Sequence, residues 1–319
     1  EIRELADLMQ IPVITTMMGI SVFPDDDQLF CGMIGTHGVK MANAAVNECD
    51  VLFLVGARVG DRAVKTPLAL EKTTKIIHID IDPAEIGKNI GADLPLVGDA
   101  KLVLQQMTEL AKPMKHDEWI AHIKTLGGER KYVEPAKGTV NPRVFIDRLA
   151  KKMPANVTVV ADVGQNQIWT CTEYKFRKEG RLLTSGGMGT MGYSVPAAIG
   201  AKMADNSRAT VAICGDGAFQ MSFMELATAV QFGVDIKVVV MTNNRLGMVR
   251  ELQTNGYHDR QTAVFLDGSP DFIKLAEAYG IPAMRVYDDD TMDKGIEMLA
   301  EHKGICLVEV VVDKDMPTL

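Results

Sequence analysis

The sequence lacks the features of membrane-spanning proteins and of disulfide-rich secreted domains. None of its apolar runs reaches the roughly 18 residues needed to cross a bilayer. Its five cysteines are far apart and form no C-x-x-C motif, which is typical of reduced thiols in a cytoplasmic protein rather than of disulfides or a zinc site. Positive charge is also in deficit, since the formal net charge is -8. That charge argues against nucleic acid or an anionic membrane as the main partner.

The length of 319 residues is enough for two domains, each with its own core. Residues 1–15 have the pattern of a helix followed by a strand. Because a native chain rarely begins within an element, we expect an N-terminal segment to be missing, and any targeting sequence with it. The cysteine pattern predicts a cytoplasmic location of bacterial type. Because a targeting sequence would be missing with the N-terminus, an organelle stays open as an alternative.

Apolar stretches typical of buried strands alternate with stretches of helical period along the whole chain. Near-continuous apolar runs such as VLFLVG and IKVVVM indicate strands that are buried on both faces, as in parallel sheets covered by helices. The alternation predicts an α/β fold with two doubly wound parallel-sheet domains. The expected strands are 11–15, 51–56, 75–81, 157–162, 210–215, 236–243 and 307–312, and the expected helices include 100–110, 142–152, 222–232 and 270–279.

A polar segment separates the two expected domains. Residues 113–138 have no strand pattern and contain Pro113, Gly127, Gly128 and Pro135 as breakers. A new helix is expected to begin after Asn141, because Pro follows it. We predict a first domain at 1–112, a helical linker at 113–138 and a second domain at 139–319.

The stretch 211–249 carries the most specific pattern for chemistry. One apolar strand ends at G-D-G (215–217), a helix follows, and the next strand ends at T-N-N (242–244). Both clusters should share one edge of the sheet, because open α/β sheets bind ligands at the carboxyl ends of their strands. Gly215 and Gly217 allow the backbone to approach a phosphate, and the helix start offers unpaired N–H groups.

This pattern also predicts a metal site. The Asp216 carboxylate, an asparagine amide and a backbone carbonyl form a set of hard oxygens, and two diphosphate oxygens and a water would complete the octahedron that Mg²⁺ prefers. A lone G-D-G is common and a strand-end Asn is more often a turn residue, so the combination carries the prediction. From the pattern alone, either Asn243 or Asn244 could supply the amide.

The combination resembles the fingerprint of thiamine-diphosphate enzymes, and the chain resembles the catalytic large subunit of the acetohydroxyacid synthase (acetolactate synthase) family over nearly its whole length. The motif H-I-D-I-D-P-A-E-I-G-K-N at 78–89 points most strongly to this family. Further matching motifs are D-V-G-Q-N-Q-I-W at 162–169, G-M-G-T-M-G-Y at 187–193, P-A-A at 196–198, M-G at 18–19 and G-T-H-G at 35–38.

The resemblance implies roles for individual residues. The family's spacing selects Asn243 as the metal-binding amide, and the backbone carbonyl of Arg245 becomes the third protein ligand beside Asp216. Met191 would be the apolar wedge that bends the cofactor, although without the resemblance it would be interpreted as core packing. The carbonyl of Gly189 would accept a hydrogen bond from the aminopyrimidine. The remaining expected contacts are Met248 to the substrate, and Gln165, Gly217 and Ala218 to the diphosphate.

The resemblance also implies that the first domain binds FAD. Residues 58–62, R-V-G-D-R, keep both arginines of the family's R-F-D-D-R but only one aspartate. A dinucleotide-type domain that has lost FAD or holds it weakly therefore stays open. A catalytic role for His37 or His78 is not favoured, because such histidines are more often structural. The expected FAD contacts are Gly35, Thr36, His37, Gly38, Arg58, Arg62, Asp80, Asp82, Asp99 and Ala100.

The activity implied by the family is a decarboxylating condensation of pyruvate with a second 2-keto acid. The product would be 2-acetolactate or 2-aceto-2-hydroxybutyrate, on the route to valine, isoleucine and leucine. The resemblance further implies a homodimer or tetramer, and it leaves a regulatory small subunit open. Leu252 replaces a tryptophan associated with a preference for 2-ketobutyrate, which weakens the case for that preference.

The chain departs from the family in one further respect. The family's N-terminal pyrimidine-binding domain carries the glutamate that activates the cofactor, and no residue here takes that role, so we expect a fragment that is inactive alone. Another thiamine-diphosphate enzyme (a pyruvate oxidase, glyoxylate carboligase or benzoylformate decarboxylase) stays open as an alternative. A non-catalytic cofactor-binding module is the second alternative.

Overall fold

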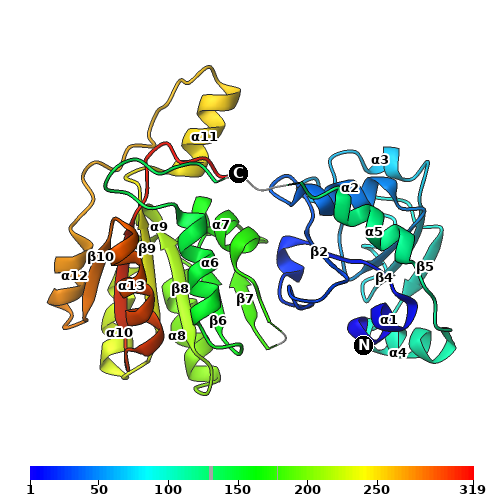
Figure 1. Cartoon of the computed structure of the whole chain (residues 1–319), viewed down its shortest axis with the longest axis horizontal. Coiled ribbons are helices and arrows are strands. Elements are labelled where there is room, and N and C mark those ends of the chain that lie inside the picture. The colour runs from blue at the N-terminus through cyan, green and yellow to red at the C-terminus, as the bar shows by residue number, and fades with distance from the viewer. Residues whose placement is uncertain (129–131, 178) are drawn as a thin grey trace. The chain divides into compact units, whose positions relative to one another are not determined.

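The computed structural model describes residues 1–128, 132–177 and 179–319. The chain forms two compact units, Glu1–Arg130 and Lys131–Leu319 (unit 1 and unit 2), and each is described by itself (Figure 1). All strand pairs of the named sheets are parallel. The predicted α/β fold with parallel sheets is thus confirmed. Of the helices within the described ranges, none is long and apolar enough to span a membrane.

Unit 2 is built on a six-stranded sheet in the order β10-β11-β9-β8-β6-β7. Every residue of β9 is buried and only the last residue of β8 is partly exposed, which explains why these segments have continuous apolar sequences. The strands are β6 Thr158–Ala161, β7 Arg181–Thr184, β8 Thr210–Gly215, β9 Lys237–Thr242, β10 Ala283–Val286 and β11 Cys306–Val311.

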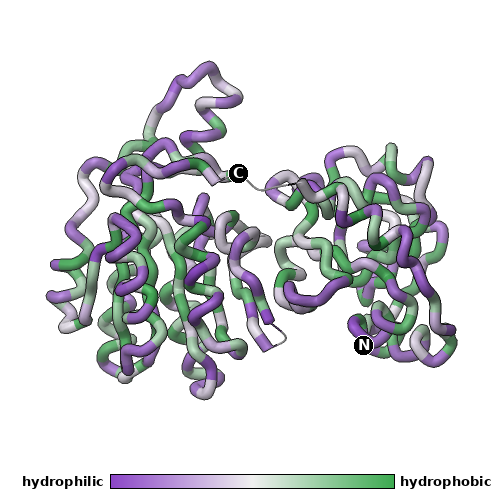
Figure 2. Tube along the Cα trace, viewed as in Figure 1, coloured by the Kyte–Doolittle hydropathy of each residue, from purple (hydrophilic) through white to green (hydrophobic). Residues whose placement is uncertain are grey.

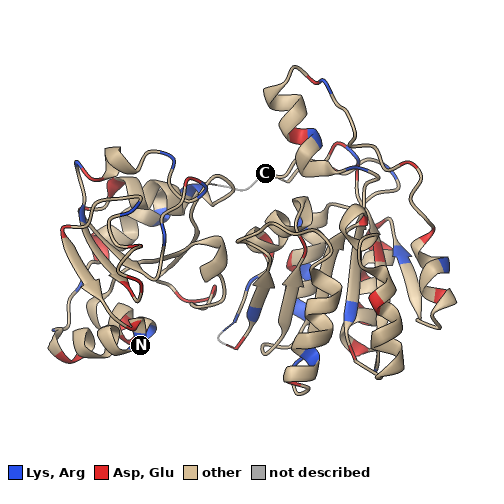
Figure 3. Cartoon of the chain, turned by 180° about the vertical axis from the view of Figure 1, so that it is seen from behind, with Lys and Arg blue, Asp and Glu red and all other residues tan. Residues whose placement is uncertain are grey.

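Helices cover both faces of this sheet. α8 and α12 pack on one face, and α13 packs on the other, where α6 contacts both α7 and α13. Apolar residues follow the strands while charged residues lie mostly on helices and loops (Figures 2 and 3). The helices are α6 Pro142–Lys152, α7 Gln165–Glu173, α8 Ser194–Ala204, α9 Asp216–Phe219, η2 Phe223–Glu225, α10 Leu226–Gln231, α11 Gly247–Gly256, α12 Phe272–Ala278 and α13 Asp289–Glu301.

Unit 1 contains two parallel sheets in its described part. β1 pairs with β2, and β3, β4 and β5 form the second sheet in that order. The strands are β1 Val13–Thr15, β2 Phe30–Met33, β3 Val51–Val55, β4 Lys75–Asp80 and β5 Leu94–Val97, and the helices are α1 Ile2–Met9, η1 Met17–Gly19, α2 Lys40–Glu48, α3 Pro67–Leu70, α4 Ala100–Leu110 and α5 Asp117–Thr125.

The segment 113–138, predicted as a helical linker, contains α5, which packs on α2 of unit 1. Ile123 of α5 is 2% exposed and joins a buried cluster with Cys31 and Ala45. Apolar burial of this kind holds a helix to its domain. Residues 129–131 of the segment lie outside the described ranges. The domain boundaries at 112 and 138 stay predictions.

Candidate functional site

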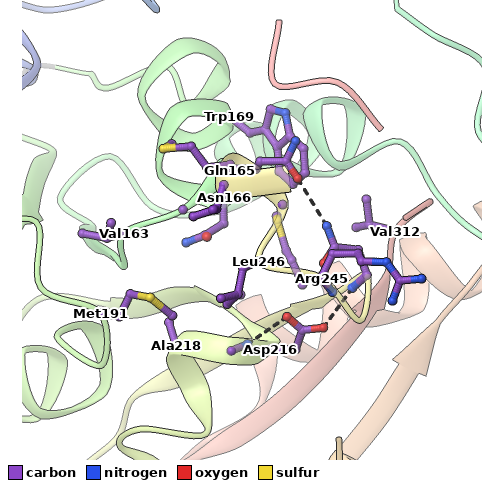
Figure 4. Close-up of a pocket in the computed structure, with 18 residues that line it drawn as sticks. Val163, Gln165, Asn166, Trp169, Met191, Asp216, Ala218, Arg245, Leu246 and Val312 are labelled. Carbon is purple, nitrogen blue, oxygen red and sulfur yellow. Dashed lines mark hydrogen bonds between the residues drawn. The ribbon is translucent and has the colours of Figure 1, made fainter. Parts of the chain in front are cut away.

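A pocket of unit 2 lies at the carboxyl ends of β6, β8 and β9 (Figure 4). The strand order reverses here, because β7 lies on one side of β6 and β8 on the other. Ligands of doubly wound sheets bind at such a switch point. The pocket brings together these residues predicted from the sequence: Gln165, Met191, Gly215, Asp216, Gly217, Ala218, Asn243, Arg245 and Met248.

The carboxylate of Asp216 lies in the pocket wall and is only 1% exposed. One oxygen accepts from the N–H of Gly217 at 2.8 Å. The other accepts from the N–H groups of Asn244 at 2.7 Å and Asn243 at 3.2 Å. The side chain therefore joins the turn after β8 to the loop after β9.

Burial raises the pKa of the Asp216 carboxyl from its ordinary value of 3.8 to about 6, and the N–H donors of Asn244, Gly217 and Asn243 oppose that shift. Within the described residues, no Lys, Arg or His is among the groups that shift this pKa. A buried carboxylate without a counterion is costly in free energy. The geometry therefore favours a cation bound to the Asp216 carboxylate.

Asn243 and Arg245 lie beside this carboxylate. The Asn243 amide oxygen accepts from the Arg245 N–H at 3.0 Å, and its amide nitrogen donates to Gln165 Oε1 at 3.2 Å. Among the described residues, no backbone N–H donates to the carbonyl of Arg245. In the same described ranges, no group of three or more His, Cys, Asp or Glu side chains could hold a metal. A metal here would therefore rely on amide and carbonyl oxygens beside one carboxylate.

The exposed Asn244 contrasts with Asn243. Its backbone φ is 53°, in the left-handed region that Asn tolerates better than most residues. Asn243, not Asn244, lines the pocket. Asn244 thus has the properties of a turn residue.

Gln165 links the pocket to the C-terminal segment. It is 4% exposed, and its amide nitrogen donates to the Met316 carbonyl at 2.9 Å and to Thr318 Oγ1 at 3.1 Å. Trp169 adds a hydrogen bond from Nε1 to the Pro317 carbonyl at 3.2 Å. The amide nitrogen of Gln165 therefore already has protein acceptors. Its contact with a diphosphate stays a prediction.

Gly247 fits the space beside Gln165. A Cβ at position 247 would lie 1.9 Å from Gln165 Oε1, a distance that no side chain reaches without displacing its neighbour. The first residue of α11 must therefore be a glycine if Gln165 is to keep its hydrogen bond to Asn243.

Asp162 fixes the loop that carries Met191. Its carboxylate is fully buried and accepts from the N–H groups of Val163 at 2.9 Å, Gly192 at 3.0 Å and Ser194 at 2.8 Å. Charge-assisted hydrogen bonds of this type are among the stronger ones in proteins. They place Met191 in the pocket, where its terminal methyl lies 3.5 Å from the position of a Cβ on Gly217.

Gly189 behaves differently from the other predicted residues. It is exposed and is not among the residues that line the pocket. Its φ is 66°, and its N–H donates to the Ser185 carbonyl at 2.8 Å. The hydrogen bond expected from its carbonyl to an aminopyrimidine stays a prediction.

The pocket also contains residues for which the sequence analysis predicts no role. Asn166 donates to the carbonyls of Asp162 at 2.8 Å and Ile213 at 3.2 Å, so it joins the ends of β6 and β8. Asn166 lies within the motif D-V-G-Q-N-Q-I-W at 162–169, and this motif could have identified it as a site residue. Val312 follows β11 and lies in none of the matching motifs, so the sequence did not identify it. The other residues of this kind are Val163, Gly164, Trp169, Met241, Leu246, Gly247 and Val249.

In unit 1, the residues predicted for FAD form two groups near strand ends. Gly35 has a φ of 119°, and a Cβ there would lie 2.4 Å from the Arg62 carbonyl, which accepts from the Thr36 N–H at 2.9 Å. The loop 35–38 therefore contacts the segment 58–62. In the second group, the Asp80 carboxylate accepts from the Asp82 N–H at 2.9 Å, and its carbonyl accepts from the Gly98 N–H at 2.9 Å.

Asp99 and Ala100 already have a structural role in this second group. Asp99 caps α4, because its carboxylate accepts from the Leu102 N–H at 3.1 Å, and Ala100 is the first residue of that helix. An apolar cavity of unit 1 is lined by residues of α1, β1 and β3 and includes none of the residues predicted for FAD.

Two family models match the chain in succession. Residues 1–107 match the central domain of thiamine pyrophosphate enzymes, and residues 162–310 match the C-terminal TPP binding domain. The chain belongs to the thiamine pyrophosphate enzyme family. All residues that line the pocket described above, except Val312, lie within the part that matches the TPP binding domain.

Relatives in this family are described as acetolactate synthases. The chain is 40% identical to the probable acetolactate synthase large subunit of Methanocaldococcus jannaschii, over 98% of this chain and 55% of the relative. It is 36% identical to the large subunit of Lactococcus lactis (98% and 54%) and 39% identical to the acetolactate synthase of Arthrospira platensis (99% and 56%). The predicted resemblance is confirmed, and the chain spans about half the length of these relatives.

The raised pKa of Asp216 predicts a pH-dependent metal affinity. Because the folded-state pKa is about 6, the proton occupies this carboxyl below that pH and competes with a cation, whereas above it the carboxylate is available. We expect Mn²⁺ affinity, measured by electron paramagnetic resonance without any phosphate ligand, to be constant above about pH 7 and to fall by up to about tenfold per pH unit below pH 6. An affinity that is constant down to pH 5 contradicts the assignment.

Proposed function

We propose that unit 2 binds the diphosphate of thiamine diphosphate through Mg²⁺ and that the chain forms part of an acetolactate synthase. The observation that carries the proposal is the buried Asp216 carboxylate, which lies at the switch point beside Asn243 and has no counterion among the described residues. The match of this part of the chain to the TPP binding domain supports it.

The residues of the pocket fit this group. Asp216, Asn243 Oδ1 and the Arg245 carbonyl supply hard oxygen ligands of the kind that Mg²⁺ prefers, with room left for diphosphate oxygens and water. Gly215 and Gly217 offer backbone close to the metal ligands. Ala218 and Gln165 complete this part of the wall.

The apolar side of the pocket suits the chemistry. When bound, thiamine diphosphate would supply a nucleophilic ring carbon for the keto carbon of pyruvate and a positively charged ring to take up the electron pair released with carbon dioxide. Met191, Met248, Val249 and Val312 line the pocket with apolar groups, and such a lining excludes the water that would quench a reactive carbon. We assign Met191 as the apolar support under the cofactor and Met248 as a contact to the 2-keto acids, since both line the pocket.

The reaction we propose joins pyruvate to a second 2-keto acid and gives 2-acetolactate or 2-aceto-2-hydroxybutyrate for the synthesis of branched-chain amino acids. The names of the relatives support the reaction. Leu252 is 61% exposed on α11, the helix that also carries Met248. Its aliphatic side chain, in place of the family's tryptophan, weakens the case for a preference for 2-ketobutyrate.

We further propose that the chain works as a homodimer or tetramer in the cytoplasm. Met188, Met221 and Met224 are 90%, 58% and 57% exposed, and the Met221 segment contacts the loop of Met191, because a Cβ on Gly192 would lie 3.0 Å from Met221 Cβ. Exposed apolar groups next to a site are typical of a surface that a partner covers.

The five free cysteines fit a reducing compartment such as the cytoplasm. Since two of the relatives are called large subunits, a regulatory small subunit is a candidate partner.

Binding of thiamine diphosphate tests the metal assignment. We expect Asp216→Ala to abolish Mg²⁺-dependent binding and Asn243→Ala to weaken it at least about tenfold, because each removes a metal ligand. Asn244→Gly is the matched control, since glycine also tolerates the positive φ, and it should bind like the wild type. Calorimetric titration of the chain checks this, and unchanged binding by Asp216→Ala would falsify the assignment.

Product analysis tests the reaction. A preparation in which this chain is combined with a pyrimidine-binding domain should convert pyruvate to acetolactate, and the isolated chain should not turn over, because it has no residue assigned to activate the aminopyrimidine. Release of acetaldehyde or acetyl phosphate would favour the alternative thiamine enzymes. Turnover by the isolated chain would contradict the proposed division of the site.

For unit 1 we propose FAD as a ligand of the loop 35–38, the segment 58–62 and the strand-end residues Asp80 and Asp82. The resemblance of these segments to the family's FAD-binding motifs supports this choice, and they lie within residues 1–107, which match the central domain. The purified chain should carry flavin that appears in the absorption spectrum and is released by denaturation. Arg62→Ala should lower the flavin content, while Arg260→Ala in unit 2 should not. A colourless protein that takes up no added FAD contradicts the proposal.

A further inference from the structure

The loop that carries two of the three proposed metal ligands is held by a second segment of unit 2. Arg245 and Phe265 form an isolated antiparallel bridge. The Leu246 N–H donates to the Val264 carbonyl at 2.9 Å, and the Leu266 N–H donates to the Asn244 carbonyl at 3.0 Å. The segment 264–267 therefore runs beside the metal loop 243–246.

Side chains reinforce this bridge through Arg245, whose guanidinium points away from Met191 (Figure 4). The Arg245 guanidinium donates to Asp267 Oδ1 at 2.8 Å and to the Asn244 carbonyl at 2.7 Å. The same guanidinium lies over the Phe265 ring, 4.7 Å from its centroid. One side chain thus contacts both strands of the bridge, by charge, by hydrogen bonding and by stacking.

The same segment also reaches the turn that carries Asp216. A Cβ placed on Gly217 would lie 3.1 Å from Leu266 Cδ1 and 2.8 Å from Leu246 Cδ2. Leu246 and Leu266 therefore pack closely against the G-D-G turn, one from each strand of the bridge. The segment 264–267 contacts both halves of the proposed ligand set, one through Asn244 and Arg245 and the other through Gly217.

We propose that Arg245, Phe265 and Asp267 form a clamp. In the absence of the metal, this clamp holds the loop 243–245 in its metal-binding conformation. Arg245 then has two separate functions: its carbonyl is a metal ligand, and its side chain is the centre of the clamp. Phe265 and Asp267 are positioning residues. The inference rests on the proposed metal site and deepens it.

The clamp acts on metal affinity more than on folding. Asp267 is 73% exposed, and an ion pair with an exposed partner contributes little to the free energy of unfolding. A loop that is not held in place populates several conformations, and the apparent affinity for a ligand falls by the fraction that is competent to bind. Loss of the clamp should therefore weaken Mg²⁺ binding, and it should lower the unfolding midpoint of the cofactor-free chain by no more than a few degrees.

The experiment is a Mg²⁺ titration of the whole chain at saturating thiamine diphosphate. We expect about two- to fivefold weaker Mg²⁺ binding in Asp267→Asn and about three- to tenfold weaker binding in Arg245→Met. The double variant should be no weaker than Arg245→Met alone, because both substitutions break one interaction. In the cofactor-free protein, the amides of Leu246 and Leu266 should exchange with solvent faster in both single variants.

The matched control is Asp293→Asn, which breaks the Arg148–Asp293 ion pair of similar geometry, 3.1 Å long with Asp293 72% exposed. It should change neither Mg²⁺ affinity nor amide exchange in the loop. Unchanged Mg²⁺ affinity in both Asp267→Asn and Arg245→Met overturns the clamp, whether or not the unfolding midpoint falls. That result does not affect the assignment of the metal ligands. If the wild-type chain binds no Mg²⁺ with thiamine diphosphate, the proposed metal site fails and the clamp with it.

Discussion

The buried carboxylate of Asp216 is the constraint on which the site depends. Its hydrogen bonds to the N–H groups of Gly217, Asn243 and Asn244 join the ends of two neighbouring strands. Those bonds exist only because β8 and β9 are parallel and in register, with Gly215 opposite Met241. In the metal-free chain the same burial is unfavourable for a charged carboxylate. The fold therefore maintains an arrangement whose free-energy cost a cation would offset.

Around this carboxylate, two polar side chains hold the neighbouring loops. Asp162, at the end of β6, accepts the N–H groups of Gly192 and Ser194 and so sets the position of Met191. Gln165 connects Asn243 to the carbonyl of Met316. The polar and apolar sides of the pocket are thus built by separate hydrogen-bond networks, which meet at the ends of three strands.

Sequence patterns predicted the elements with strong local signals. The helix 142–152 has the predicted bounds because Asn141 caps it and Pro142 occupies its first turn. The short edge strands β5, β7 and β10 were not predicted, since four residues with partial exposure carry no clear period. The expected helix 222–232 is a 3-10 turn followed by α10, a division that the apolar spacing does not reveal.

For the site, the motifs identified residues on strand ends, because parallel topology brings such ends together whatever their separation in sequence. Contacts that depend on distant segments could not be predicted in this way. The hydrogen bond from Gln165 to Thr318 and the bridge between Arg245 and Phe265 each join segments without any shared pattern. Gly189 is a different case: a family motif assigns it a cofactor contact, it does not line the pocket of this chain, and the contact stays a prediction.

An anomalous diffraction map of crystals of the chain, grown with Mn²⁺ and thiamine diphosphate, would locate the metal relative to Asp216. We expect one strong metal peak within about 2.0–2.3 Å of an Asp216 carboxylate oxygen, Asn243 Oδ1 and the Arg245 carbonyl, with diphosphate oxygens completing its coordination. A peak coordinated by Asn244 instead of Asn243, or a bound diphosphate with no metal at Asp216, would contradict it.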